Sequence, residues 1–390
     1  MSNYTPYSSF EQNNSGLPKI VVIGMGGGGS NAVNRMIEDQ MRGVTFVSAN
    51  TDAQALANNL APYKIQLGPK LTRGLGAGGL PTVGESAAEE SIKELTAIMQ
   101  GADLVFLTAG MGGGTGTGSI PVAARVAKEC GAVTVGIVTK PFSFEMGRRQ
   151  SNTKEGLEKL RKYCDTLIVI PNDKLLEIAP RDLPLEMAFT LADDVLRKGV
   201  QGISELITET GLINVDFAHI KNIMKRGGGA LMSIGTGEGP DKVHQAIDKA
   251  LHHPLLDDID LYSATGIIAN FTGSSDMSFK DLTDALKMLQ DATGGHADVI
   301  PGIITDERMS DRVQLILIVT GIGAPKSNFS QSSFSGIVST DPIELQPVET
   351  TTQKEVVEPV NEIGINQYPG QSDPTDHLSI PAFLRRRSQK

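Results

Sequence analysis

The chain has 390 residues, enough for two domains of ordinary size, and 39% of them are hydrophobic while 21% are charged. Its net charge of −10 disfavours nucleic acid as a partner, because phosphate repels a protein of that sign, and the absence of Trp disfavours a base-stacking surface. Two cysteines are too few for a disulfide scaffold or a zinc cluster, and no apolar run approaches the ~18 residues that a membrane span needs.

Short apolar runs alternate with helical patterns in the first half of the chain. Residues 1–17 are polar, with neither a basic start nor an apolar stretch, so we expect a disordered leader and not a signal peptide. Continuous apolar runs are typical of strands buried on both faces of a parallel sheet. They predict strands at Lys19–Ile23, Val44–Ala49, Asp103–Leu107, Ala132–Val138 and Thr166–Ile170. With a helix over Glu85–Gln100, they indicate an α/β domain with a Rossmann-like parallel sheet at residues 18–184.

A long helical pattern follows from Leu185 to Thr208, and we expect a central helix at residues 185–210 that joins two domains. A second, smaller α/β domain is predicted at residues 211–323. Its strands are expected at Ala230–Ile234, Thr265–Phe271, Val299–Ile304 and Val313–Thr320, and its helices at Asp241–Leu251 and Lys280–Gln290.

The composition changes sharply after the second domain. Residues 324–376 are rich in Ser, Thr, Gln, Pro and Glu and lack periodicity, so we expect a disordered acidic linker. Residues 377–390 carry four basic side chains and a small apolar cluster, Ile380, Phe383 and Leu384. That i, i+3, i+4 spacing puts the cluster on one face of a helical turn, which is typical of a short tail that binds a partner's apolar groove.

Two glycine-rich segments carry the chemistry. Gly24-Met-Gly-Gly-Gly-Gly-Ser-Asn31 follows the first strand and opens a helix expected to begin at Asn31–Ala32. It satisfies the G-x-G-x-x-G dinucleotide pattern but has no P-loop lysine. Gly112-Gly-Gly-Thr-Gly-Thr-Gly118 follows another strand and precedes a helix expected to begin at Ser119. Two such loops at the carboxyl edge of one sheet can bind a di- or triphosphate from both sides, whereas a single loop is as often only a tight turn.

The second glycine segment matches the signature of the tubulin/FtsZ family, in the form usual for its bacterial members. The resemblance runs from about Leu17 to Gly323. It includes Asn50-Thr-Asp-Ala-Gln-Ala-Leu56, Gly74-Leu-Gly-Ala-Gly78, Thr139-Lys-Pro-Phe-Ser-Phe-Glu145, Asn172-Asp-Lys-Leu175 and Asn214-Val-Asp-Phe217.

The resemblance implies a GTP site. Its expected phosphate contacts are the amides of Gly27, Gly28, Gly29, Ser30, Asn31, Gly114, Thr115 and Gly116. Glu145 and Arg149 match positions near the ribose and phosphates, although alone they could form a surface ion pair. Asn172 lies in a matching motif, Phe189 matches a residue that stacks beside guanine, and Asp193 matches the residue that reads the guanine edge. Without the resemblance, Asp193 reads as a solvated helix residue.

In this family the hydrolytic site is shared, because a loop of one subunit enters the nucleotide pocket of the next. Asn214 and Asp216 match that loop as catalytic residues. His219 stands where the family usually has a second acid. Since a neutral imidazole cannot supply the fixed charge of a carboxylate, the departure leaves the hydrolysis rate open.

The resemblance therefore implies a cytoplasmic GTPase that polymerises head to tail into the division ring at midcell. GTP or GDP is the expected ligand, with Mg²⁺ as charge partner for the phosphates. The tail Leu378–Arg387 is expected to bind division proteins, including membrane anchors, so that the membrane is reached only through partners. Two alternatives stay open: a nicotinamide dehydrogenase that uses Gly24–Gly29 as its Rossmann turn, and a structural filament partner with weak GTPase activity, which His219 favours.

Overall fold

A computed structural model describes residues 17–145, 147–209, 211, 215–226, 229–257 and 260–322. The expected leader up to residue 16, the linker at 324–376 and the tail at 377–390 lie outside the described residues. Within the described part, no helix is both long enough and apolar enough to cross a membrane.

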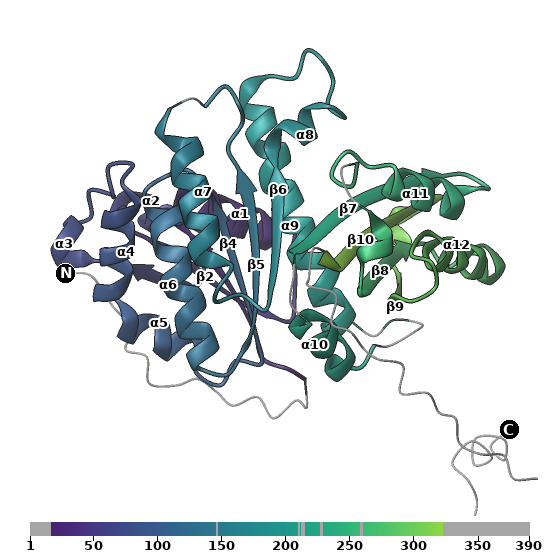
Figure 1. Cartoon of the computed structure of the whole chain (residues 1–390), viewed down its shortest axis with the longest axis horizontal. Coiled ribbons are helices and arrows are strands. Elements are labelled where there is room, and N and C mark those ends of the chain that lie inside the picture. The colour runs from purple at the N-terminus through teal and green to yellow at the C-terminus, as the bar shows by residue number, and fades with distance from the viewer. Residues whose placement is uncertain are drawn as a thin grey trace, which may run out of the picture. The chain divides into compact units, whose positions relative to one another are not determined.

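The predicted parallel sheet is confirmed in the first half of the chain (Figure 1). Its strands pair in the order β3-β2-β1-β4-β5-β6, all parallel. They are β1 (Ile20–Met25), β2 (Val44–Asn50), β3 (Tyr63–Gln66), β4 (Leu104–Gly110), β5 (Val133–Lys140) and β6 (Thr166–Pro171). Only β3 was not predicted, because four residues at the edge of a sheet leave too short an apolar pattern.

Helices cover both faces of this sheet. They are α1 (Gly26–Glu38), α2 (Ala53–Ala57), α3 (Pro69–Thr72), α4 (Pro81–Glu90), α5 (Ile92–Met99), α6 (Thr115–Glu129), α7 (Arg148–Leu160) and α8 (Asn172–Leu176). The single helix predicted over Glu85–Gln100 is wrong, since α4 ends and α5 begins around Ser91. The buried Ser91 hydroxyl accepts a hydrogen bond from the Gly68 amide at 3.0 Å, and this tie to the loop after β3 interrupts the helix.

The central helix α9 (Leu185–Thr208) coincides with the predicted pattern and packs against both halves of the sheet. After α10 (Phe217–Lys225), the sheet continues through β7 (Gly229–Glu238), β10 (Arg312–Ile322), β8 (Gly266–Gly273) and β9 (Asp298–Thr305). Strand β10 is antiparallel to β7 and β8, so the complete sheet is mixed. Helices α11 (Lys242–Leu251) and α12 (Phe279–Ala292) confirm the two helices predicted here.

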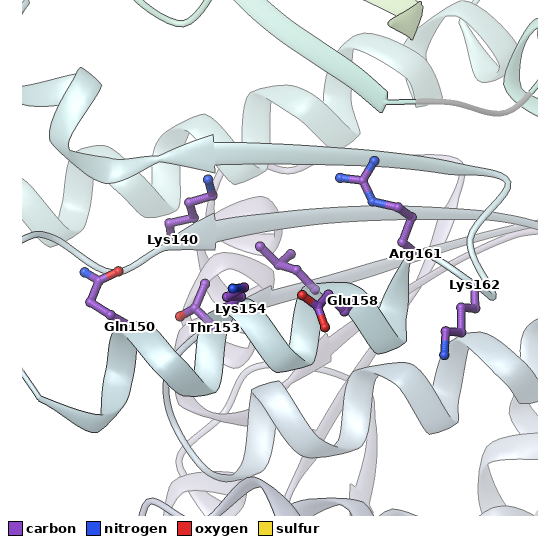
Figure 2. A pocket seen from close by; sticks show the side chains of 8 residues that line it. Lys140, Gln150, Thr153, Lys154, Glu158, Arg161 and Lys162 are labelled. Carbon is purple, nitrogen blue, oxygen red and sulfur yellow. The ribbon is translucent and has the colours of Figure 1, made fainter. Parts of the chain in front are cut away.

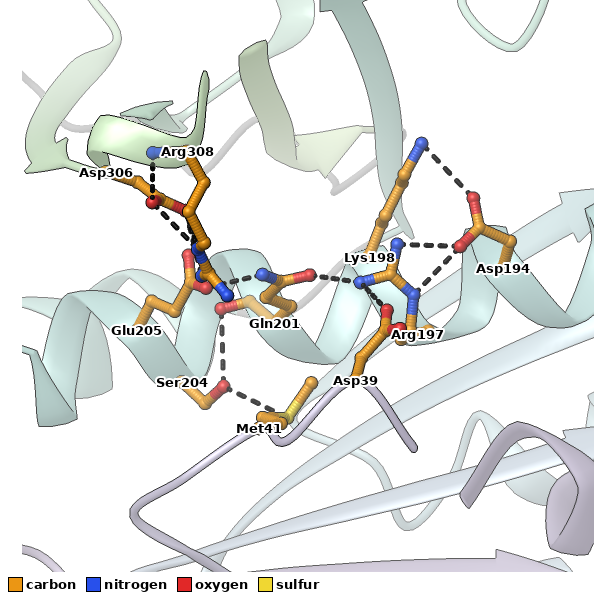
Figure 3. Close-up of polar contacts among 10 residues, drawn as sticks. All are labelled: Asp39, Met41, Asp194, Arg197, Lys198, Gln201, Ser204, Glu205, Asp306 and Arg308. Atoms are coloured by element: carbon orange, nitrogen blue, oxygen red, sulfur yellow. Dashed lines mark hydrogen bonds and ion pairs between the residues drawn. The ribbon is translucent and has the colours of Figure 1, made fainter. Parts of the chain in front are cut away.

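A line of polar contacts runs along α9 (Figure 3). The Arg197 side chain, only 13% exposed, pairs with Asp39 at 2.9 Å and with Asp194 at 2.7 Å. Burial favours the neutral form of Asp194, but Lys198 and Arg197 outweigh burial and hold its pKa below the usual range. Because Asp39 directly follows α1, these ion pairs fix α9 against the helix that carries the first glycine segment.

Candidate functional site

The first glycine segment forms the N-terminal turn of α1. The helix begins at Gly26, so the expected start at Asn31 is wrong by five residues. Gly26 has a φ of +69°, and a Cβ there would lie 2.6 Å from the Gly116 amide nitrogen. Gly27 is exposed and its Cβ position is open. Because the first amides of a helix have no intrahelical partner, this turn presents free N–H groups.

The second glycine segment forms the N-terminal turn of α6. This helix begins at Thr115 and not at Ser119, with Pro121 inside it. Glycine is a poor helix former, which is why both segments resemble loops in the sequence. A Cβ at Gly116 would lie 3.0 Å from the Met25 carbonyl oxygen, and one at Gly114 would lie 2.8 Å from the Leu80 amide nitrogen. The two helix N-termini therefore meet directly.

The other residues of α1 that were expected to contact phosphate differ in exposure. Asn31 is exposed, whereas Gly28 is half-buried and Gly29 is buried. The buried Ser30 hydroxyl lies 2.8 Å from the Ser48 hydroxyl of β2, so its side chain faces the sheet.

A hydroxyl contact joins the second glycine segment to the loop after β2. The Thr51 hydroxyl of that loop lies 2.6 Å from the Thr115 hydroxyl. Two helix dipoles and several free amides thus converge where a polyphosphate can bind.

Glu145 and Arg149 form an ion pair at the start of α7. The Glu145 carboxylate is 9% exposed and accepts a hydrogen bond from the Phe142 amide at 2.9 Å. Asp173 in α8 accepts one from the Ser143 amide at 2.9 Å. These two carboxylates hold the loop after β5, while the half-exposed Arg149 guanidinium stays available to an anion.

Three phenylalanines cluster between this loop and α9. Phe142 and Phe144 stack with ring centroids 5.1 Å apart, and Phe189 meets Phe142 edge-on at 5.4 Å. Phe144 and Phe189 remain partly exposed, which leaves aromatic surface for a planar base. Nearby in the chain, the buried Asn172 has a side-chain oxygen with no hydrogen-bond partner among the described residues.

Asp193 faces α1 from one turn beyond Phe189. Its carboxylate lies 3.4 Å from Arg35, which also donates to the Thr190 hydroxyl at 3.1 Å. Burial raises the pKa of Asp193 to about 6, although the charge of Arg35 offsets part of the effect. A 15%-exposed carboxylate that is ionised at neutral pH can accept two hydrogen bonds from a ligand.

The expected catalytic residues Asp216 and His219 lie at the start of α10, not among the residues described above. Exposed Asp216 caps α10 by accepting from the Ala218 amide at 2.9 Å, and exposed His219 follows in the first turn of that helix. Asn214 lies outside the described residues. Figure 1 shows α8 near the upper ends of the strands and α10 near their lower ends, so the two helices lie far apart. The nucleotide-side residues and Asp216 therefore do not meet within one copy.

Sequence reasoning missed Arg35, Thr51 and the two phenylalanines of the β5 loop as members of this cluster. Arg35 stands one helical turn after Asn31, so its place on the same face of α1 could have been found. Its pairing with Asp193, 158 residues later, has no local signal.

Comparisons with known proteins identify the family of the chain. Residues 19–180 match the model of the GTPase domain of the Tubulin/FtsZ family, and residues 228–323 match that of the C-terminal domain of the FtsZ family. An empty FtsZ dimer from M. jannaschii is 44% identical, with 78% of this chain and 88% of that chain covered and a TM-score of 0.75.

CetZ2 from Haloferax volcanii, solved as a GTPγS-bound protofilament, is 20% identical, with 79% of this chain and 94% of that chain covered and a TM-score of 0.66. That second likeness supports the fold alone. A matched GTPase domain removes the dehydrogenase alternative. The chain therefore belongs to the FtsZ family, the tubulin-like GTPases that form the filaments of the division ring.

Proposed function

We propose that GTP binds between the N-termini of α1 and α6 and is hydrolysed only when a second copy supplies Asp216. One observation carries this proposal: the two sets of residues lie at opposite ends of α9. From Asp193 to its last residue, Thr208, α9 runs for about 22 Å towards the segment that leads to Asp216, which is far beyond hydrogen-bond reach. Head-to-tail stacking is the arrangement that joins the two ends, and it repeats into a filament.

The chemistry at such an interface divides between the two copies. The amides of Gly27, Gly28 and Gly116 stabilise charge on the phosphates, and Asp193 accepts hydrogen bonds from N1–H and the 2-amino group of guanine. The partner's Asp216 orients a water that attacks the γ-phosphorus. A new O–P bond forms, the bond to the β-phosphate oxygen breaks, and GDP and phosphate result. Assembly creates the site, and hydrolysis removes part of what holds the interface.

Mg²⁺ is the expected charge partner of the phosphates. Neither α1 nor α6 carries an acidic residue in its first turn, and no cluster of three His, Cys, Asp or Glu occurs in the described part of the chain. This fits an ion held mainly by phosphate oxygens and water, which is usual for Mg²⁺. When bound, the ion neutralises phosphate charge.

His219 favours a slower GTPase as a second candidate function. It occupies the third position of α10, where most of the family has an acid, so a single carboxylate acts on the water.

The C-terminal tail is the segment that we propose binds other proteins. We expect Leu378–Arg387 to bind division proteins, including membrane anchors, and thereby to bring a cytoplasmic polymer to midcell. The apolar face of Ile380, Phe383 and Leu384, followed by three arginines, supports recognition by an apolar groove.

Guanine recognition should depend on pH. Below about pH 6 the Asp193 carboxyl is protonated, and its O–H then faces the N1–H and 2-amino groups of guanine, which are also hydrogen-bond donors. GTP affinity should therefore fall between pH 7.5 and pH 5. Asp193→Ala should narrow the preference for GTP over ATP by about 10- to 100-fold and abolish this pH dependence. Titration with fluorescent GTP measures both, with Asp194→Asn as control because Asp194 binds Arg197 instead. Equal competition by ATP in the wild type would refute the assignment.

Two inactive variants should restore each other. Asp216→Asn removes the charge but keeps a residue suited to cap α10. Mixed with Asp193→Ala at low GTP, it should regain up to about a quarter of wild-type turnover, since random order joins two intact halves at one interface in four. Phosphate release in the mixture is compared with the sum of the separate activities. Recovery no greater than that sum, in polymers shown to contain both variants, would contradict a shared site.

Restoring the second acid should accelerate hydrolysis. His219→Asp adds a negative charge in the first turn of α10, where the helix dipole favours it, so folding should be preserved. We expect a several-fold faster turnover, below the ~10²-fold of a residue in direct contact, and shorter-lived polymers. Turnover and light scattering are recorded together, with the uncharged His219→Asn as control. Equal rates for both variants would mean that charge at this position is unimportant.

Removing the tail should separate assembly from placement. Deletion of Leu378–Lys390 should leave GTP turnover and filament formation nearly unchanged, because these residues lie outside both matched domains. Imaging of the truncated chain in cells tests the placement of the filaments, which should lose their midcell position. Normal midcell rings and normal division would exclude the recognition role.

A further inference from the structure

A cavity of about 690 Å³ lies beside α7. It is lined by residues of α7, by those that follow its C-terminal end and by the last residue of β5 (Figure 2). We call it the basic groove, and its lining includes Lys140, Lys154, Leu157, Glu158, Arg161 and Lys162. Neither the matched GTPase chemistry nor the proposed shared site uses these residues.

The basic groove carries four cations, Lys140, Lys154, Arg161 and Lys162, against the single carboxylate of Glu158. All four cations are exposed, and none of them forms an ion pair within the part of the chain that the structure describes. Lys159 on the same helix behaves differently, since it pairs with Glu85 at 2.6 Å. A concentration of unpaired positive charge in a protein of net charge −10 is a local feature that favours an anionic partner.

The shape and floor of the groove favour a peptide. Leu157 is half-buried and packs against the core, so the floor is apolar beneath a basic rim. From Gln150 to the end of α7 at Leu160 the groove follows the helix for about 15 Å, the length of four or five extended residues. A partner that fits therefore alternates carboxylates with aliphatic side chains.

We propose that the basic groove binds an acidic peptide segment rich in aliphatic residues, of the kind that this chain carries at residues 341–362. That stretch contains six carboxylates and one lysine, interspersed with Ile343, Leu345, Val348, Val356, Val357 and Val360. Within the length of the groove, a stretch such as Glu355–Glu358 brings two carboxylates to the unpaired cations, and Val356 and Val357 between them match the apolar floor. A nucleic acid would also complement the charge, but it has no aliphatic side chains to cover the apolar surface of Leu157.

The test measures binding of a fluorescent synthetic peptide of residues 341–362 to the full chain by anisotropy. Lys154→Glu combined with Arg161→Glu should weaken binding by about tenfold or more, because two attractive contacts become repulsive. Lys93→Glu makes a charge change of the same sign on α5, outside the groove, and should bind as the wild type does. Higher salt should weaken binding to the wild type and have less effect on the double variant.

No detectable binding to the wild type would overturn the proposal. So would equal binding by the double variant and the Lys93→Glu control, or tighter binding of a DNA oligonucleotide of equal charge at the same groove. A peptide with all six carboxylates replaced by amides should fail to bind, and retained affinity would equally overturn the charge argument. GTP turnover of both variants is measured in parallel, because it should remain near the wild-type value and thereby shows that the fold is intact.

Discussion

Direct contact between the N-terminal turns of α1 and α6 is the constraint on which the proposed nucleotide site depends. Both ends carry the positive pole of a helix dipole, so their approach is electrostatically unfavourable in the absence of an anion. Only glycine permits it, since a Cβ at Gly26 would overlap the Gly116 amide. Bound phosphate removes the repulsion and uses the free amides of both turns. The same packing that disfavours the empty site therefore strengthens anion binding.

Helix α9 connects the residues proposed to recognise the base with the opposite edge of the sheet. Near its start, Asp193 contacts Arg35 of α1, and one turn later Arg197 binds Asp39, the residue that follows α1. Both contacts tie α9 to the helix whose first turn belongs to the proposed phosphate site. Helix α9 is continuous from these contacts to Thr208, so one rigid element joins that site to the opposite end of the strands.

Much of the fold could be predicted because buried parallel strands leave continuous apolar runs, as in β1 and β4, and because α9 has a long unbroken helical period. The helix starts could not, since glycine propensity indicates a loop where Gly26 in fact begins a helix. The break at Ser91 depends on a hydrogen bond to Gly68, which no local pattern contains. Asp193 likewise needed the family resemblance, because one acid on an amphipathic helix has no distinctive pattern.

Among the described residues, the two halves of the sheet are joined by a short ladder, in which Leu167 and Ile168 of β6 pair with Gly229 and Ala230 of β7. Helix α9 crosses this junction without a break and packs against both halves of the sheet. In a head-to-tail filament of the proposed kind, a pull along the filament axis would therefore be shared between the short ladder and a helix whose backbone hydrogen bonds lie parallel to its axis.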